Sequence, residues 1–269
     1  MGLAYNAEIT IGNRHMRGKD PYIIGTPSER DRELYEFPPG TKGRRSYTDA
    51  KPRFFTHSSQ GTWFAKHANF EGCRFLEIGS REVTGPSRIK CHIPLASYTG
   101  FDIIEGPNVD IVGDAHELSK QIAAESVDFV YSTAVFEHLA MPWLVVEEVA
   151  KILKVGGVVG IETHFSHSEH EYPWHFYQFN EHALRNLFCP ELGFEVLDSG
   201  MENPIVGRFS FDAKKSKIGD PIYCLYVHSS ILARKTRSVD LDHWNWRDCL
   251  TRIRSDSEYP ANTVRKAKK

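Results

Sequence analysis

The sequence has no pairing pattern among its cysteines. Five are present, none of them in a C-x-x-C unit: Cys73, Cys91, Cys189, Cys224 and Cys249. Disulfide frameworks show even numbers of cysteines at regular spacing, and thiolate zinc sites use closely spaced pairs. The scattered, odd set argues against both and indicates a reducing compartment. We therefore expect a cytoplasmic protein.

Long apolar runs are also missing. No stretch approaches the roughly 20 consecutive apolar residues that a membrane-spanning helix needs. The start, MGLAYNAEITIGNRHMRGKD, has no apolar segment behind a basic end, as a secretory signal would. We expect neither a signal peptide nor a membrane partner.

An excess of one charge is the third absence. The 269 residues include 33 Lys and Arg against 35 Asp and Glu, a formal net charge of -2. Binding to a nucleic-acid backbone would require a basic surface, and the sequence shows no basic stripe. The expected partner is a small molecule and not a nucleic acid, while the oligomeric state stays open.

Short apolar runs alternate with helical patterns between Cys73 and about Lys235. The runs are CRFLEI, ASYTGFD, VDIVGD, VDFVYS, VGGVVGIETHF, FEVLDSG and YCLYVHSSILA. Several are apolar at consecutive positions, as strands buried on both faces are. The alternation predicts an α/β protein with a Rossmann-like, mostly parallel seven-stranded sheet and helices on both faces.

The connecting segments carry helix signals. SKQIAAE and PWLVVEEVAKILK are expected to be helical, the second with Leu144, Val145 and Val149 at helical spacing and Gly156-Gly157 as its stop. NEHALRNLF begins with Asn180, which can cap a helix. Around this domain, expected at 71–236, we expect an irregular lead-in or cover at 1–70 and a C-terminal tail at 237–269.

The stretch FLEIGSREVTG resembles a nucleotide-binding turn but lacks the glycines of G-x-G-x-x-G. Arg81 stands where a second glycine would let the backbone approach a pyrophosphate. A ligand with adenosine but no pyrophosphate needs only the first glycine, Gly79, and still needs acids for its ribose hydroxyls and ammonium group. S-adenosylmethionine is such a ligand.

Three acids follow three successive predicted strands. Glu77 ends the first strand, Asp102 ends the second, and Asp114 follows the third in GDAHEL. Asp102 is placed to accept hydrogen bonds from both ribose hydroxyls, and Asp114 to recognise the adenine amino group. Ser132 lies at the carboxyl end of the fourth strand, where it can contact the methionine portion.

Together these motifs resemble the class I S-adenosylmethionine-dependent methyltransferases, in particular the small-molecule and ubiquinone-type O-methyltransferases. The resemblance covers about 70–235 and rests on LEIGS, YTGFD, GDAHEL, VDFVYSTAVFEHL, LKVGGVVGIET and ALRNLFCPELGFEV. It departs from the family at Arg81, where GSREVTG is similar to a GS..VNG variant of bacterial members. The N-P-P-Y turn of amino-methylating nucleic-acid enzymes is absent, because the chain has STAV there.

The resemblance implies S-adenosylmethionine as the cofactor and a set of residues that hold it. The set is Glu77, Gly79, Ser80, Arg81, Asp102, Ile103, Asp114, Ala115, His116 and Ser132.

The segment after the fifth strand is rich in histidine. His164, His167, His170, His175 and His182 fall within nineteen positions, in a lid expected at 164–180. One of them can be a general base, H-x-x-H-x-x-H with interleaved glutamates can bind a divalent metal, or the rings can simply pack. We favour a base and assign no metal ligand.

The candidate bases are few. His164 and His167 lie nearest the strand end. His138 in VFEHL is either a third candidate or part of a polar latch.

The expected function is O-methylation of a hydroxyl on a small molecule. The resemblance implies a sugar or nucleotide-sugar acceptor, as in bacterial surface polysaccharide biosynthesis. The alternatives are N- or C-methylation of another small metabolite and a non-catalytic module that binds S-adenosylmethionine.

Overall fold

The computed structural model describes residues 60–83, 85–209, 213–217 and 221–256. The expected lead-in lies almost entirely outside these residues. The helices and 3-10 helices (η) are α3 Gln60–His67, α4 Arg88–His92, η1 Ala115–Lys120, η2 Phe136–His138, α5 Pro142–Ile152, α6 Glu181–Leu187, η3 Pro190–Leu192 and α7 Asp248–Asp256. The strands are β1 Arg74–Ile78, β2 Ser97–Asp102, β3 Ile111–Val112, β4 Val127–Thr133, β5 Leu153–His164, β6 Phe194–Arg208 and β7 Pro221–Lys235.

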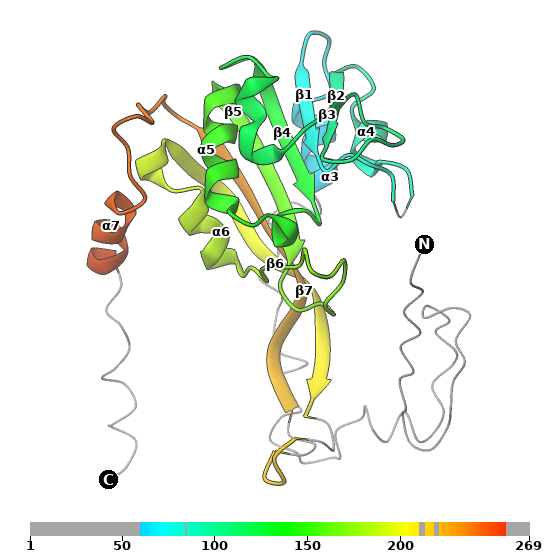
Figure 1. Ribbon diagram of the computed structural model, residues 1–269, viewed down its shortest axis with the longest axis vertical. Coiled ribbons are helices and arrows are strands. Elements are labelled where there is room, and N and C mark those ends of the chain that lie inside the picture. The colour runs from blue at the N-terminus through cyan, green and yellow to red at the C-terminus, as the bar shows by residue number, and fades with distance from the viewer. Residues whose placement is uncertain (1–59, 84, 210–212, 218–220, 257–269) are drawn as a thin grey trace. The chain divides into compact units, whose positions relative to one another are not determined.

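These strands form one seven-stranded sheet in the order β3-β2-β1-β4-β5-β7-β6 (Figure 1). β1 to β5 run parallel, and β7 enters antiparallel between β5 and β6. The predicted α/β fold and mostly parallel sheet are confirmed. β6 and β7 are each 15 residues long, so their ladder extends beyond the pairing of β7 with β5 (Figure 1).

Helices cover both faces, as predicted. On one face Phe64 of α3 and Ile89 of α4 pack against Phe75 and Phe129. Phe64 is fully buried, although it lies in the segment 1–70 that was expected to be a lead-in. On the other face Val145 and Val149 of α5 and Leu184 of α6 pack against the apolar side chains of β1, β4 and β5. Within the described ranges, no helix is long and apolar enough to cross a membrane.

Two local predictions are corrected. The segment SKQIAAE is not an α-helix: η1 ends at Lys120 and a turn follows, because only Leu118 and Ile122 reach the core there. Helix α5 ends at Ile152, ahead of the glycine pair, and Gly156, with φ +88°, lies inside β5. The cap at Asn180 is confirmed, since its side chain accepts the N–H of Ala183 at 2.9 Å.

A buried lysine seals the end of α5. Lys235 is 2% exposed, and its ammonium group donates to the carbonyls of Ala150 and Leu153 at 2.7 and 2.8 Å and to Glu125 at 2.9 Å. The last carbonyls of a helix have no partner within the helix, so this cation satisfies groups that burial would otherwise leave unpaired.

We predict that Lys235→Met lowers the free energy of unfolding by about 2–4 kcal/mol, because two buried carbonyls lose their donor. The matched control is Arg234→Met, whose side chain is 45% exposed and faces Glu195 at 3.7 Å, and which should cost at most about 0.5 kcal/mol. Urea unfolding followed by circular dichroism measures both. Equal losses would mean that Lys235 does not cap α5.

Candidate functional site

The candidate site lies where the parallel strands end. Strand order reverses between β1 and β4, which are neighbours in the sheet. Open α/β sheets bind ligands in the crevice at such a point, beyond the carboxyl ends of the strands. Ile78 of β1 and Ser132 of β4 are paired across it.

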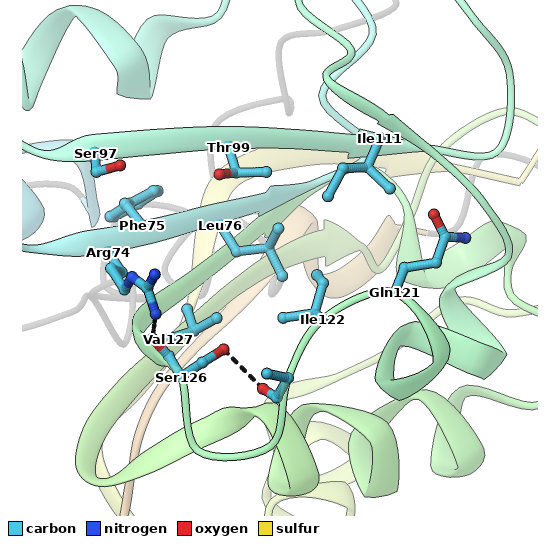
Figure 2. Close-up of a pocket in the computed structure, with 11 residues that line it drawn as sticks. Arg74, Phe75, Leu76, Ser97, Thr99, Ile111, Gln121, Ile122, Ser126 and Val127 are labelled. Atoms are coloured by element: carbon cyan, nitrogen blue, oxygen red, sulfur yellow. Dashed lines mark hydrogen bonds between the residues drawn. The ribbon is translucent and has the colours of Figure 1, made fainter.

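A hollow of about 270 Å³ lies elsewhere on the sheet (Figure 2). Its lining includes Arg74 and Ser97, the first residues of β1 and β2, above a floor that contains Leu76 and Ile122. It opens beside the amino ends of these strands, so it is not part of the candidate site.

Gly79 makes the turn after β1, and two constraints require glycine there. Its φ is +77°, a conformation that side chains disfavour, and its N–H donates to the carbonyl of Phe101 at 2.8 Å. A Cβ at this position would lie 2.0 Å from Cγ2 of Val135. The turn therefore packs directly against the segment that leaves β4.

Glu77, two residues before Gly79, stabilises the turn through hydrogen bonds to its carboxylate. It is 4% exposed, and one carboxylate oxygen accepts the hydroxyls of Ser87, at 2.7 Å, and of Tyr98. Burial raises the pKa of Glu77, against the effect of these two hydrogen bonds. The contacts tie the end of β1 to β2 and to the cap of α4.

Asp102 ends β2 and contacts Arg81. Oδ2 accepts the N–H of Arg81 at 3.1 Å, Oδ1 accepts that of Ile104 at 3.0 Å, and Nε of Arg81 lies 3.7 Å from Oδ1. The arginine side chain packs over Gly106, where a Cβ would lie 2.8 Å from its Cδ. Arg81 is thus folded onto the acid, and each carboxylate oxygen keeps a second lone pair.

Asp114 caps the start of η1 and contacts His116. Its Oδ1 accepts the N–H of His116 at 2.9 Å and lies 2.6 Å from ring Nδ1. Burial opposes them, yet these bonds lower the pKa of Asp114, which stays ionised. Ala115 is buried, and Ile103 is 64% exposed beside Asp102.

Ser132 has a buried hydroxyl without a partner. The residue is 0% exposed, and among the described residues its Oγ makes no hydrogen bond. An unpaired buried hydroxyl costs about 1–3 kcal/mol, which a polar ligand can recover. The hydroxyl of Ser80, in contrast, already donates to the carbonyl of Asn108 at 2.9 Å.

These features fit S-adenosylmethionine. Asp102 has lone pairs for vicinal hydroxyls, Asp114 is an ionised acceptor, and the orphaned hydroxyl of Ser132 can receive or donate one more hydrogen bond.

Glu137 and His164 form a buried acid–base pair. Glu137 is 0% exposed; its Oε2 accepts the hydroxyl of Thr163 at 2.6 Å, and its Oε1 lies 2.6 Å from Nδ1 of His164. Burial opposes the effect, but these contacts lower the pKa of Glu137 below its usual value. An ionised carboxylate beside Nδ1 requires the proton on that nitrogen, so Nε2 of neutral His164 carries a free lone pair.

The lid is held to the same residue by its backbone. The carbonyl of Glu137 accepts the N–H groups of Phe176 and Tyr177 at 2.8 and 3.2 Å, and ring Nδ1 of His138 lies 2.8 Å from the carbonyl of Trp174. His138 thus acts as a polar latch between η2 and the lid, with Nε2 3.8 Å from Glu171.

Histidine rings of the lid segment and of neighbouring elements form one cluster. The ring centroid of His164 lies 4.2 Å from that of His167, 5.1 Å from that of His170 and 5.3 Å from that of His228. The chain also brings His170 within 4.6 Å of His175 and 4.8 Å of His138. The predicted candidates His138, His164 and His167 therefore belong to one cluster, whereas the side chain of His182 is 70% exposed.

Sequence reasoning missed one acid of the site, Glu162 near the end of β5. Burial and the nearby charge of Glu202 raise the pKa of Glu162 to about 7. Glu162 faces Thr133 in the β4 register, and Glu202 accepts the hydroxyl of Ser230 at 3.0 Å. Glu162 and Gly160 lie two residues apart on β5, so they lie on the same face of the sheet. The proximity of Glu162 to β6 depends on how β7 pairs with β5 and β6, which the sequence does not show.

Comparison with known proteins gives one family. Residues 86–161 match a family model described as a methyltransferase domain, which ends before the lid. No curated protein matches the sequence.

Similar solved structures include three bacterial and archaeal proteins. The YcgJ protein from Bacillus subtilis is 15% identical, with a TM-score of 0.46 over 68% of this chain and 100% of its own. A putative methyltransferase from Bacillus halodurans is 16% identical, with a TM-score of 0.47 over 66% and 99%. A SAM-dependent methyltransferase from Archaeoglobus fulgidus is 18% identical, with a TM-score of 0.46 over 65% and 93%. At these identities the likeness concerns the fold alone.

We predict that Gly79→Ala lowers the free energy of unfolding by about 1–3 kcal/mol more than Gly72→Ala does, because only Gly79 faces Val135. Gly72 is a matched control: its φ is +83° and nothing lies within 4 Å of an added Cβ, so it shares the backbone strain alone. Urea unfolding of both variants gives the difference. Equal losses would show that Val135 moves aside freely.

We predict that Glu162→Gln stabilises the protein increasingly as pH rises from about 4.5 to about 7. The native pKa is raised, so the native state holds its proton more tightly, and the contribution of Glu162 to stability is lost as pH rises through that window. The gain above the window is on the order of 3 kcal/mol. Urea unfolding across the pH range measures it. Glu195→Gln, whose side chain is 60% exposed, is the control, and a pH-independent difference would contradict the shift.

Proposed function

Because the chain is a class I S-adenosylmethionine-dependent methyltransferase, we propose that it methylates a hydroxyl group of a small molecule and that His164 accepts the hydroxyl proton. The observation that carries this proposal is the buried Glu137–Thr163–His164 arrangement at the carboxyl edge of the sheet.

S-adenosylmethionine is the cofactor. When bound, it supplies an electrophilic methyl group on its sulfonium sulfur, and the demethylated remainder is S-adenosylhomocysteine. We assign its ribose hydroxyls to Asp102, its adenine end to Asp114 with Ile103, Ala115 and His116, and its amino acid portion to Ser132. Gly79 and Ser80 form the turn beneath it, Glu77 holds that turn in place, and Arg81 lies against Asp102.

A hydroxyl oxygen is a weak nucleophile until it loses its proton, so O-methylation benefits from a general base. Nε2 of His164 can take that proton, and the ionised Glu137 stabilises the imidazolium that forms. His167, the second candidate base, stacks on this ring with the two centroids 4.2 Å apart. His138 is a positioning residue, since it acts through the lid.

The acceptor that these surroundings favour has a flat or carbohydrate face. Three aromatic side chains of the lid are open to solvent: Tyr172 at 82%, Trp174 at 60% and Phe176 at 43%. Apolar C–H faces of a sugar, or an aromatic ring, can pack against such surfaces. A sugar or nucleotide sugar, as used in polysaccharide biosynthesis, is therefore the acceptor class that we propose to test first.

We predict that His164→Gln lowers kcat by about 10²–10⁴ while S-adenosylmethionine affinity changes little, because the base acts on the acceptor and not on the cofactor. Glu137→Gln should lower kcat in the same direction, and His182→Gln is the control. The assay follows transfer of ¹³C-labelled methyl to a panel of sugars, nucleotide sugars and phenols, with titration calorimetry for the cofactor.

The position of the labelled carbon in the product decides between the alternatives. An O-methyl product made by the wild type and lost in His164→Gln supports the proposal. A methyl group on nitrogen or carbon would replace it with N- or C-methylation. Cofactor binding without any transfer across an extended metabolite pool would indicate a non-catalytic binding module.

A further inference from the structure

We infer that three lid histidines, His164, His167 and His170, form a binding site for a divalent transition-metal cation of the zinc class. Each offers one ring nitrogen, and the three nitrogens lie within 4.8 Å of one another. The inference rests on the proposed function only for its effect on catalysis and not for the binding itself.

The contacts of the three Nδ1 atoms indicate which nitrogen of each ring can bind a metal. Nδ1 of His164 lies 2.6 Å from Glu137, and Nδ1 of His167 and of His170 lie 3.1 and 2.9 Å from one carbonyl, that of Ser168. Carbonyl and carboxylate oxygens only accept, so all three rings carry their proton on Nδ1 and the lone pair on Nε2. Histidines that bind metals almost always donate their second nitrogen in this way, because the bond fixes the tautomer and raises ligand basicity.

The neighbouring ring of His175 has the opposite arrangement. Its Nδ1 accepts the N–H of His170 at 3.3 Å, so its proton lies on Nε2 and it offers no lone pair there. The distinction separates the three proposed ligands from a histidine that merely packs beside them.

The donor set selects the class of cation. Three neutral imidazoles suit zinc, copper, nickel or iron, whereas magnesium and calcium take oxygen ligands. His164 is buried, His170 half-buried and His167 exposed, so the cluster runs from the core to the surface. Three protein ligands leave a fourth position open, as in zinc sites that exchange ligands.

A bound cation would compete with the proposed base. The lone pair on Nε2 of His164 cannot hold a metal and accept a proton at the same time. Cation binding should therefore remove the base function of His164, and zinc should inhibit a hydroxyl transfer that depends on it.

The test is titration of the metal-stripped full-length protein with Zn²⁺ alone by calorimetry, repeated with Co²⁺, whose visible absorption reports nitrogen ligation. We expect one equivalent to bind, and His167→Gln and His170→Gln to weaken binding at least about tenfold. His182→Gln is the matched histidine control. Two other groups could hold the ion: Cys249→Ala tests Cys189, Glu191 and Cys249, and His138→Gln tests Glu137, His138 and His170.

The outcomes separate this inference from the proposed function. Absence of binding, or binding kept in His167→Gln but lost in Cys249→Ala or His138→Gln, would overturn the metal site and leave the role of His164 as a base untouched. Binding at the histidines without loss of methyl transfer would establish the site and overturn that role. Zinc inhibition that is weaker in His170→Gln, relative to its own metal-free rate, supports both.

Discussion

A carboxylate without access to solvent, that of Glu137, holds this site together. A buried charge is costly unless it is paired, and here Thr163 of β5 donates a hydrogen bond to one oxygen while Nδ1 of His164 lies 2.6 Å from the other. The backbone carbonyl of the same residue holds the lid through Phe176 and Tyr177. One residue therefore joins the exit of β4, the end of β5 and the lid, so the position of His164 depends on it.

The half of the site proposed to hold the cofactor depends on a different constraint, which is the close approach of backbone. Gly79 packs against Val135, and Gly100 leaves room for Ser80 and the carbonyl of Asn108. Arg81 is accommodated because it turns aside onto Asp102. The variant loop thus places a cation next to the acid assigned to the ribose.

Apolar runs and strand-end acids made most of the fold predictable. Continuous runs such as CRFLEI can only be buried strands when helices alternate with them, and Gly79, Asp102 and Asp114 had to meet because parallel strands end at one edge. The segment 119–125 was mispredicted because helix propensity was present without an apolar stripe to hold a helix.

Partners across the sheet could not be predicted. The contacts of Glu77 with Tyr98 and of Glu162 with the charge of Glu202 depend on register between distant strands. The density of histidines in the lid was visible in the sequence, but the carbonyl of Ser168 that orients two of them depends on a loop conformation that no periodicity encodes.

The place of β7 in the sheet has a consequence for synthesis of the chain. β6 leaves the ribosome before β7, yet β7 lies between β5 and β6, so β6 emerges with no strand to pair with and β5 has an open edge. The residue that seals α5, Lys235, is the last of β7. A nascent chain that stops before Lys235 exposes the unpaired edges of β5 and β6 and the uncapped end of α5. The insertion of β7 pairs both edges and caps the helix in one step.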